Sequence, residues 1–161
     1  RLTGLLLGQT LHTQAHEIYR AYIEATAFGA LTIIKRMEEF DVGVDEVVCT
    51  GGLSLKNDTL MQIYADVLDR PMKVSASEQT CALGAAMLAA VAAGHDTLSN
   101  LQERIVSYSD TVYHPNSENA AVYRKIYSLY RTLHDAFGKT DWSGSIDHVM
   151  KELLDLRDQA S

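Results

Sequence analysis

The hydrophobic and polar positions of the chain form short apolar runs that alternate with longer segments of helical period. The runs predict strands at residues 2–7, 46–50 and 72–74. Apolar residues at helical spacing predict helices at about residues 13–39, 57–68, 78–93, 97–104 and 117–137. Strands that alternate with helices are typical of an α/β fold, in which helices cover a largely parallel sheet. A ligand of such a sheet binds at the carboxyl ends of its strands.

Three of these helices carry specific packing expectations. The helix at 13–39 is apolar over much of its circumference, with Tyr19, Tyr22 and Ile33 among its inward positions, so we expect it between two layers. The alanine-rich helix at 78–93 has small side chains, which favour a close approach to the sheet. The helix at 117–137 carries an aromatic stripe that indicates core packing, formed by Tyr123, Ile126, Tyr127, Tyr130, Leu133, His134 and Phe137.

The end of the chain differs from the rest. Residues 138–144 form a polar linker, and Ser145 is positioned to cap a last amphipathic helix. Its apolar positions are Ile146, Val149, Met150, Leu153 and Leu154. We therefore divide the chain into a domain at residues 1–138 and a linker with a terminal helix at residues 139–161.

Composition and charge narrow the class of protein. The 161 residues are 47% hydrophobic and 22% charged, which fits one domain with a sizeable core, or one lobe of a larger protein. A net charge of −7 argues against a nucleic-acid or anionic membrane partner. The longest apolar run, at residues 81–93, is shorter than the roughly 20 residues of a membrane span. The apolar run at residues 5–7 is too short for the core of a secretory signal, so we expect none. We expect a cytoplasmic chain, preceded by a further segment because Arg1 leads at once into an apolar run.

Neither the cysteines nor the histidines predict a metal site. Cys49 and Cys81 occur without a CxxC motif and are expected to be small buried hydrophobic residues. His12 and His16 share one helix face, but Glu17 does not stand where an HExxH site needs its glutamate, and no third ligand follows. The chain also lacks a P-loop and a GxGxxG motif.

The strand at 46–50 ends at two adjacent glycines, Gly51 and Gly52, and a helix follows within a few residues. Adjacent glycines at the end of a buried strand remove two side chains, so a flat or charged ligand can approach the backbone. A nucleotide is the first candidate. The alternative is a plain turn that uses glycine only for its backbone angles.

Three segments in fixed order favour the nucleotide. Residues 50–57 (TGGLSLKN), 60–67 (LMQIYADV) and 82–89 (ALGAAMLA) closely resemble the C-terminal domain of the FGGY carbohydrate kinases. Residues 8–20, 23–30 and 130–135 support the resemblance, which spans essentially residues 1–158.

The resemblance implies a partial actin-like (ribonuclease H-like) ATPase fold, in which two domains close on ATP and a sugar. It implies that Gly51 and Gly52, with Leu53, contact the adenosine of ATP, and that Lys56 and Asn57 lie at the edge of the adenine pocket. No catalytic residue and no metal ligand is assigned to this chain. In the family the general base, the Mg²⁺ ligand and the sugar-binding groups come from upstream segments, so we expect the chain to be inactive without its N-terminal domain.

The expected reaction is ATP-dependent phosphorylation of the ketopentose L-ribulose. One alternative is a kinase of the same family that acts on xylulose, glycerol or another polyol. The other is a non-catalytic nucleotide-binding or interaction module. The open sheet edge at residues 2–7 favours self-association of the chain.

Overall fold

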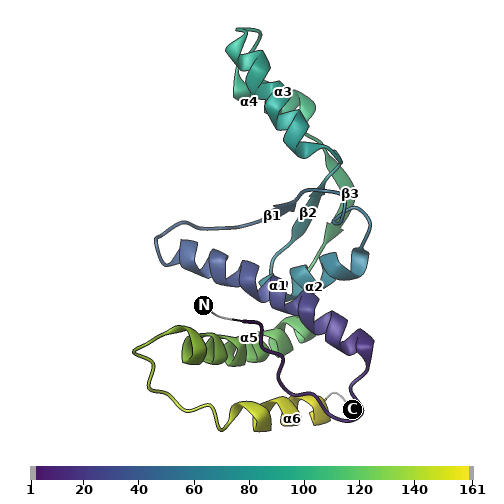
Figure 1. The fold of residues 1–161 in the computed structure, drawn as a ribbon. Coiled ribbons are helices and arrows are strands. Elements are labelled where there is room, and N and C mark those ends of the chain that lie inside the picture. Colours follow the sequence, from purple (N-terminus) through teal and green to yellow (C-terminus); the bar gives the residue numbers. More distant parts are fainter. Residues whose placement is uncertain (1–2, 160–161) are drawn as a thin grey trace.

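The computed structural model describes residues 3–159 (Figure 1). In chain order the elements are α1 (Ala15–Glu38), β1 (Val47–Cys49), α2 (Asp58–Leu68), β2 (Met72–Ser75), α3 (Thr80–Ala92), α4 (Leu98–Ile105), β3 (Tyr108–Tyr113), α5 (Ser117–Gly138) and α6 (Val149–Gln159). The α/β class is confirmed, and the expected helices form with bounds close to those the periodicity predicts. None of the helices within residues 3–159 combines the length and the apolar character that a membrane span requires.

The sheet has the strand order β1-β2-β3. β1 and β2 are parallel, as predicted, with Val47 opposite Met72 and Cys49 opposite Val74. β3 was not predicted: it returns antiparallel to β2 and places Tyr113 opposite Met72. The apolar pattern did not reveal β3 because this edge strand is mostly exposed and mixes polar residues with aromatic ones.

The core lies between the sheet and α1, α2 and α5. Met72 and Val74 of β2 are 0% and 2% exposed and face this core. The ring of Phe28, from the middle of α1, lies 5.4 to 6.1 Å from three tyrosine rings of α5. These are Tyr123, Tyr127 and Tyr130. The aromatic stripe is therefore core packing over most of its length, although Phe137 at its end is exposed.

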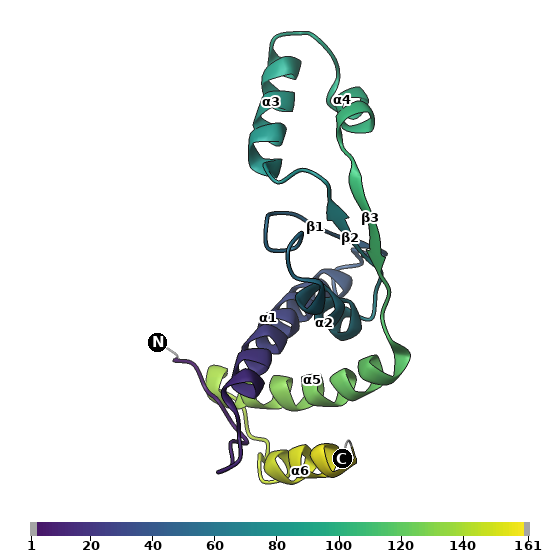
Figure 2. The same cartoon turned by 90° about the vertical axis from the view of Figure 1, so that its right-hand side faces the viewer.

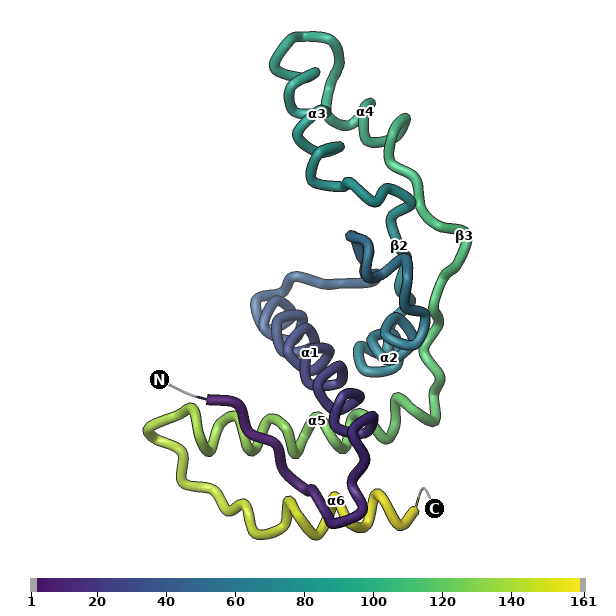
Figure 3. The backbone as a smooth tube through the Cα atoms, turned by 45° about the vertical axis from the view of Figure 1, so that its right-hand side comes forward, coloured from purple at the N-terminus to yellow at the C-terminus, as the bar shows by residue number. Residues whose placement is uncertain are grey.

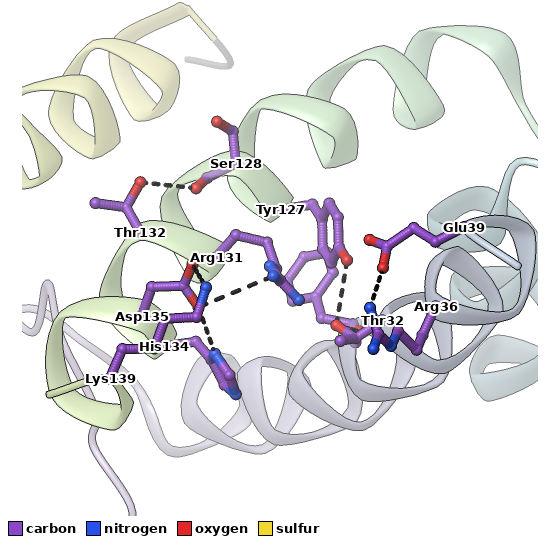
Figure 4. A network of polar contacts seen from close by, with 11 residues as sticks. Thr32, Arg36, Glu39, Tyr127, Ser128, Arg131, Thr132, His134, Asp135 and Lys139 are labelled. Carbon is purple, nitrogen blue, oxygen red and sulfur yellow. Dashed lines mark hydrogen bonds and ion pairs between the residues drawn. The ribbon is translucent and has the colours of Figure 1, made fainter. Parts of the chain in front are cut away.

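α1 contacts α2 on one side and α5 on another, which agrees with the expected position between layers. Figure 4 shows one link to α5, the hydrogen bond of 3.2 Å between the hydroxyls of Thr32 and Tyr127. The remaining circumference is open, however: Tyr19, Tyr22 and Ile33, which were expected inside, are 64%, 59% and 65% exposed.

The packing expected for α3 is wrong. None of its residues is buried, and Leu88 is 60% exposed. With α4 it forms a helical hairpin that projects away from the sheet (Figures 1 and 2), because the segment after β2 directs α3 outward and nothing else within residues 3–159 covers it. The cysteine expectation fails for the same reason at Cys81, which is exposed at the start of α3, while Cys49 is only half-buried in β1.

The strand expected at residues 2–7 is also absent from the part that the structure describes. Leu2 lies outside the described residues, and residues 3–7 form neither strand nor helix because no neighbouring strand pairs with them. The segment instead runs beside α6 (Figure 3), where the Leu153 side chain lies 3.7 Å from the position that a Cβ on Gly8 would take.

The last helix forms as an amphipathic helix, but α6 begins at Val149 rather than next to Ser145. The Ser145 hydroxyl accepts from the backbone N–H of Asp147 and so stabilises a turn that precedes the helix. Val149 is 1% exposed and anchors α6 at this end.

A buried carboxylate joins α2 to the start of α5. Asp66 is 3% exposed and accepts hydrogen bonds from the Gln62 side chain, the Asn116 backbone N–H and the Asn119 side chain, at 2.8, 2.8 and 2.9 Å. Two of these donors belong to Asn116, the N-cap of α5, and to Asn119 in its first turn. The carboxylate therefore fixes where α5 begins relative to the helix that follows the glycine turn.

Candidate functional site

The site expected from the sequence is the loop that connects β1 to α2, residues 50–57. Because β1 and β2 are parallel, this loop lies at the carboxyl end of the sheet, beside the segment that leads into α3 (Figure 2). That is the edge where open α/β sheets bind their ligands. All five candidate residues, Gly51, Gly52, Leu53, Lys56 and Asn57, belong to this single loop.

The first part of the loop is bare backbone. Gly51 has φ +100°, a conformation that side chains disfavour, so glycine is required here for the turn itself. Gly52 has no such requirement. A Cβ built on either glycine would meet no atom within 4 Å, so the space beside both is open. Within residues 3–159 neither backbone N–H is assigned a hydrogen-bond acceptor.

Ser54 holds the loop from inside. The residue is 7% exposed, and its Oγ–H donates to the carbonyl oxygen of Gly51 at 2.7 Å. The Lys56 N–H donates to the Leu53 carbonyl at 3.2 Å and tightens the same turn. Sequence reasoning did not single out Ser54; the signal was a serine three residues after a turn glycine, a spacing at which a hydroxyl can bond to the local backbone.

The two residues expected at the edge of the adenine pocket differ in their surroundings. Asn57 is the N-cap of α2: its Oδ1 accepts from the Leu60 backbone N–H at 2.9 Å. Its side-chain oxygen therefore already has a partner. Lys56 is exposed, as is Leu53 at 64%, and both flank the glycine turn on the solvent side.

Asp58, the acidic residue that follows Asn57, is hydrogen-bonded to a residue outside the loop. Asp58 accepts a hydrogen bond of 2.8 Å from the Tyr113 hydroxyl, and this bond raises the pKa of Tyr113 above its usual value. At the end of β1, burial raises the pKa of the Cys49 thiol and disfavours the reactive thiolate. The loop thus offers backbone groups and a lysine for binding.

Residues 3–159 do not gather three or more His, Cys, Asp or Glu side chains in an arrangement that could hold a metal ion. Of the pair weighed from the sequence, His16 is exposed in the first turn of α1, whereas His12 is exposed in a turn before the helix, so the two do not share a helix face. The described donors therefore do not fit Mg²⁺, and we derive no step through a metal held by this chain.

Comparison with known proteins agrees with the resemblance in the sequence. Residues 1–93 match the family model described as the FGGY family of carbohydrate kinases, C-terminal domain. The chain is 45% identical over 164 residues to a ribulokinase of Shouchella clausii, which covers 99% of the chain. It is 47% identical over 161 residues to a ribulokinase of Halalkalibacterium halodurans, which covers 97% of the chain. The chain spans 28% of the length of each of these relatives.

Solved structures show the same relationship. A ligand-bound xylulose kinase from Lactobacillus acidophilus superposes with a TM-score of 0.68 and 29% identity, over 83% of this chain and 27% of that one. A glycerol kinase from Plasmodium falciparum with ADP superposes with a TM-score of 0.62 and 26% identity, over 80% and 26%. The actin-like ATPase fold expected from the sequence is thereby confirmed. The chain belongs to the FGGY family of carbohydrate kinases, and its first 93 residues carry the match to that family's C-terminal domain.

Proposed function

We propose that this chain is part of an ATP-dependent L-ribulokinase, which converts ATP and L-ribulose to ADP and L-ribulose 5-phosphate in L-arabinose breakdown. The chain would supply the adenosine-binding wall of the ATP site. The observation that carries this proposal is the open glycine turn at the carboxyl end of β1, in a chain 45% identical to a ribulokinase over nearly its whole length.

The geometry of the loop suits this part of the reaction. Phosphoryl transfer depends on holding both substrates in position while the charge on the phosphate oxygens is neutralised. The N–H groups of Gly51 and Gly52, which have no assigned acceptor among residues 3–159, can donate to a nucleotide, and the open space beside them admits a flat ring. Leu53 and Lys56 line its exposed side, and Asn57 fixes the helix that follows.

The remaining chemistry is assigned to the rest of the kinase. The base that activates the sugar hydroxyl, the Mg²⁺ that neutralises phosphate charge and the sugar pocket all lie outside this chain in our proposal. Residues 1–138 then form the later part of the C-terminal nucleotide-binding domain, and residues 139–161 a linker with a terminal helix. That the 161-residue chain alone lacks kinase activity stays a prediction.

A second candidate is an FGGY kinase with another sugar or polyol. The observation that favours it is the structural match to a xylulose kinase and to a glycerol kinase at TM-scores of 0.68 and 0.62. The higher identity to ribulokinases, 45% against 29% and 26%, is our reason for choosing L-ribulose.

The test is Gly52→Val in the complete kinase. Because Gly52 does not have the positive φ of Gly51 and has open space around it, we expect the substitution to leave the turn intact but to fill the space proposed for adenosine. We expect the KM for ATP to rise at least about tenfold, equal to about 1.4 kcal/mol of binding energy, while the KM for L-ribulose stays within about twofold.

The matched control is Gly43→Val. Gly43 is exposed and, like Gly52, has open space beside it, but it lies in the loop before β1. It should leave both KM values unchanged. If Gly52→Val raises the KM for ATP and the KM for L-ribulose equally, in a protein of unchanged thermal stability, the adenosine assignment is refuted. Phosphorylation of D-xylulose or glycerol in preference to L-ribulose would favour the second candidate.

A further inference from the structure

Ser54 is one of the few polar side chains that the structure buries among residues 3–159, together with Asp66 and Ser75. Its hydroxyl donates to the Gly51 carbonyl oxygen at 2.7 Å, from the buried side of the turn. Burying a hydroxyl costs free energy unless it is bonded, so this single bond accounts for the position of the side chain.

The bond also fixes the direction of a backbone N–H on the opposite side of the turn. A trans peptide is planar, and its C=O and N–H point in opposite directions. The peptide that joins Gly51 to Gly52 presents its oxygen to Ser54, so its N–H, which belongs to Gly52, points away from the interior of the loop. No acceptor is assigned to this N–H in the part of the chain that the structure describes.

We propose that Ser54 is a positioning residue for nucleotide binding: by holding the Gly51 oxygen, it aims the Gly52 N–H at an acceptor atom of the adenosine moiety. The proposal rests on the proposed function of this loop. Glycine on both sides of the peptide gives it unusual rotational freedom, since neither residue has a Cβ to limit the backbone angles. Without the Ser54 hydroxyl the peptide is free to turn, and the donor direction is lost before ATP binds.

The experiment compares Ser54→Ala with Ser54→Cys in the complete kinase. Alanine removes the donor, whereas cysteine keeps nearly the same size and a weak S–H donor. We expect Ser54→Ala to raise the KM for ATP and the calorimetric Kd for ADP by about three- to tenfold, the size of one net hydrogen bond. The KM for L-ribulose should stay within about twofold, and Ser54→Cys should fall between the alanine variant and the parent.

Thr132→Ala is the matched control. Its hydroxyl also donates to a local backbone carbonyl, that of Ser128 at 3.1 Å, but on α5 (Figure 4). It should leave both KM values unchanged. If Ser54→Ala raises both KM values equally, or raises the ADP Kd no more than Thr132→Ala does, the positioning role is wrong. If the alanine variant does not fold, the cysteine variant must still show the ATP-selective loss, and its absence overturns the proposal.

The result also separates this inference from the proposed function. A selective effect of Gly52→Val on ATP with no effect of Ser54→Ala refutes the role of Ser54 alone. No selective effect of either variant refutes the nucleotide site itself.

Discussion

Asp66 offers the sharpest test of how α5 is attached to α2. The substitution Asp66→Ala removes the acceptor for three donors, which belong to Gln62, Asn116 and Asn119. Gln62 keeps a second acceptor, the His114 carbonyl at 2.9 Å. The substitution therefore orphans two donors, the Asn116 backbone N–H and the Asn119 side chain.

The expected magnitude follows from that count. A buried donor left without a partner costs about 1–3 kcal/mol; Asn116 and Asn119 are exposed residues that water can reach, so the low end applies to each and the sum is about 2 kcal/mol. Asp66→Asn keeps one oxygen for Gln62 and Asn116, and the Asn119 amide can rotate to meet the new NH₂ group. We expect the asparagine variant to lose only about 1 kcal/mol.

Urea unfolding of the 161-residue chain at low concentration, followed by helical circular dichroism, measures both values. The control is Asp69→Asn, which removes the charge from a surface ion pair with Arg124; the Asp69 side chain is 51% exposed. Asparagine also tolerates the left-handed backbone of this position, φ 52°. Such exposed pairs contribute at most about 1 kcal/mol. If Asp66→Ala costs no more than Asp69→Asn, the buried carboxylate does not hold α5 in place.

Two further predictions concern association and pH. We expect the 161-residue chain to self-associate through the apolar surface of α3. Leu88→Lys should therefore lower the mass measured by light scattering, whereas Tyr19→Lys on the exposed side of α1 should not. A strictly monomeric parent chain would contradict this expectation. Burial raises the pKa of Tyr123 to about 12, so the folded state keeps a proton that the unfolded chain loses near pH 10. The contribution of Tyr123 to the free energy of unfolding should therefore be fully present below about pH 10 and decrease as the pH rises toward 12. In urea unfolding, Tyr123→Phe should reduce this decrease. An unchanged decrease would show that the pKa of Tyr123 is not raised in the folded state.

The sequence predicted the helices and the parallel strand pair, whereas the assignment of the site to the loop after β1 stays a prediction. Helical period and turn residues are local properties that a sequence shows directly. Asn57 is a typical capping residue at the start of α2, but its use as the N-cap was not anticipated because the resemblance directed attention to its amide as a ligand contact.

The errors concern features that depend on distant partners. Residues 3–7 have the composition of a strand, but a strand needs a neighbour to pair with, and none is present within the described chain. The composition of α3 indicates a buried helix, yet whether a helix is covered depends on what packs against it. β3 was missed because an exposed edge strand lacks an apolar run. The role of Asp66 was missed because a single aspartate forms no sequence pattern.

The hydrogen bond between Arg20 and Tyr123 joins residues 103 positions apart, and it lies where α1 meets α5. During synthesis α1 emerges before α5, and the three tyrosines that surround Phe28 all belong to α5. Contacts between such distant residues carry a large loop-closure entropy, and they form slowly. On the ribosome, this half of the core therefore stays open while α2, the sheet and the α3–α4 hairpin are made, and it closes only after α5 has emerged.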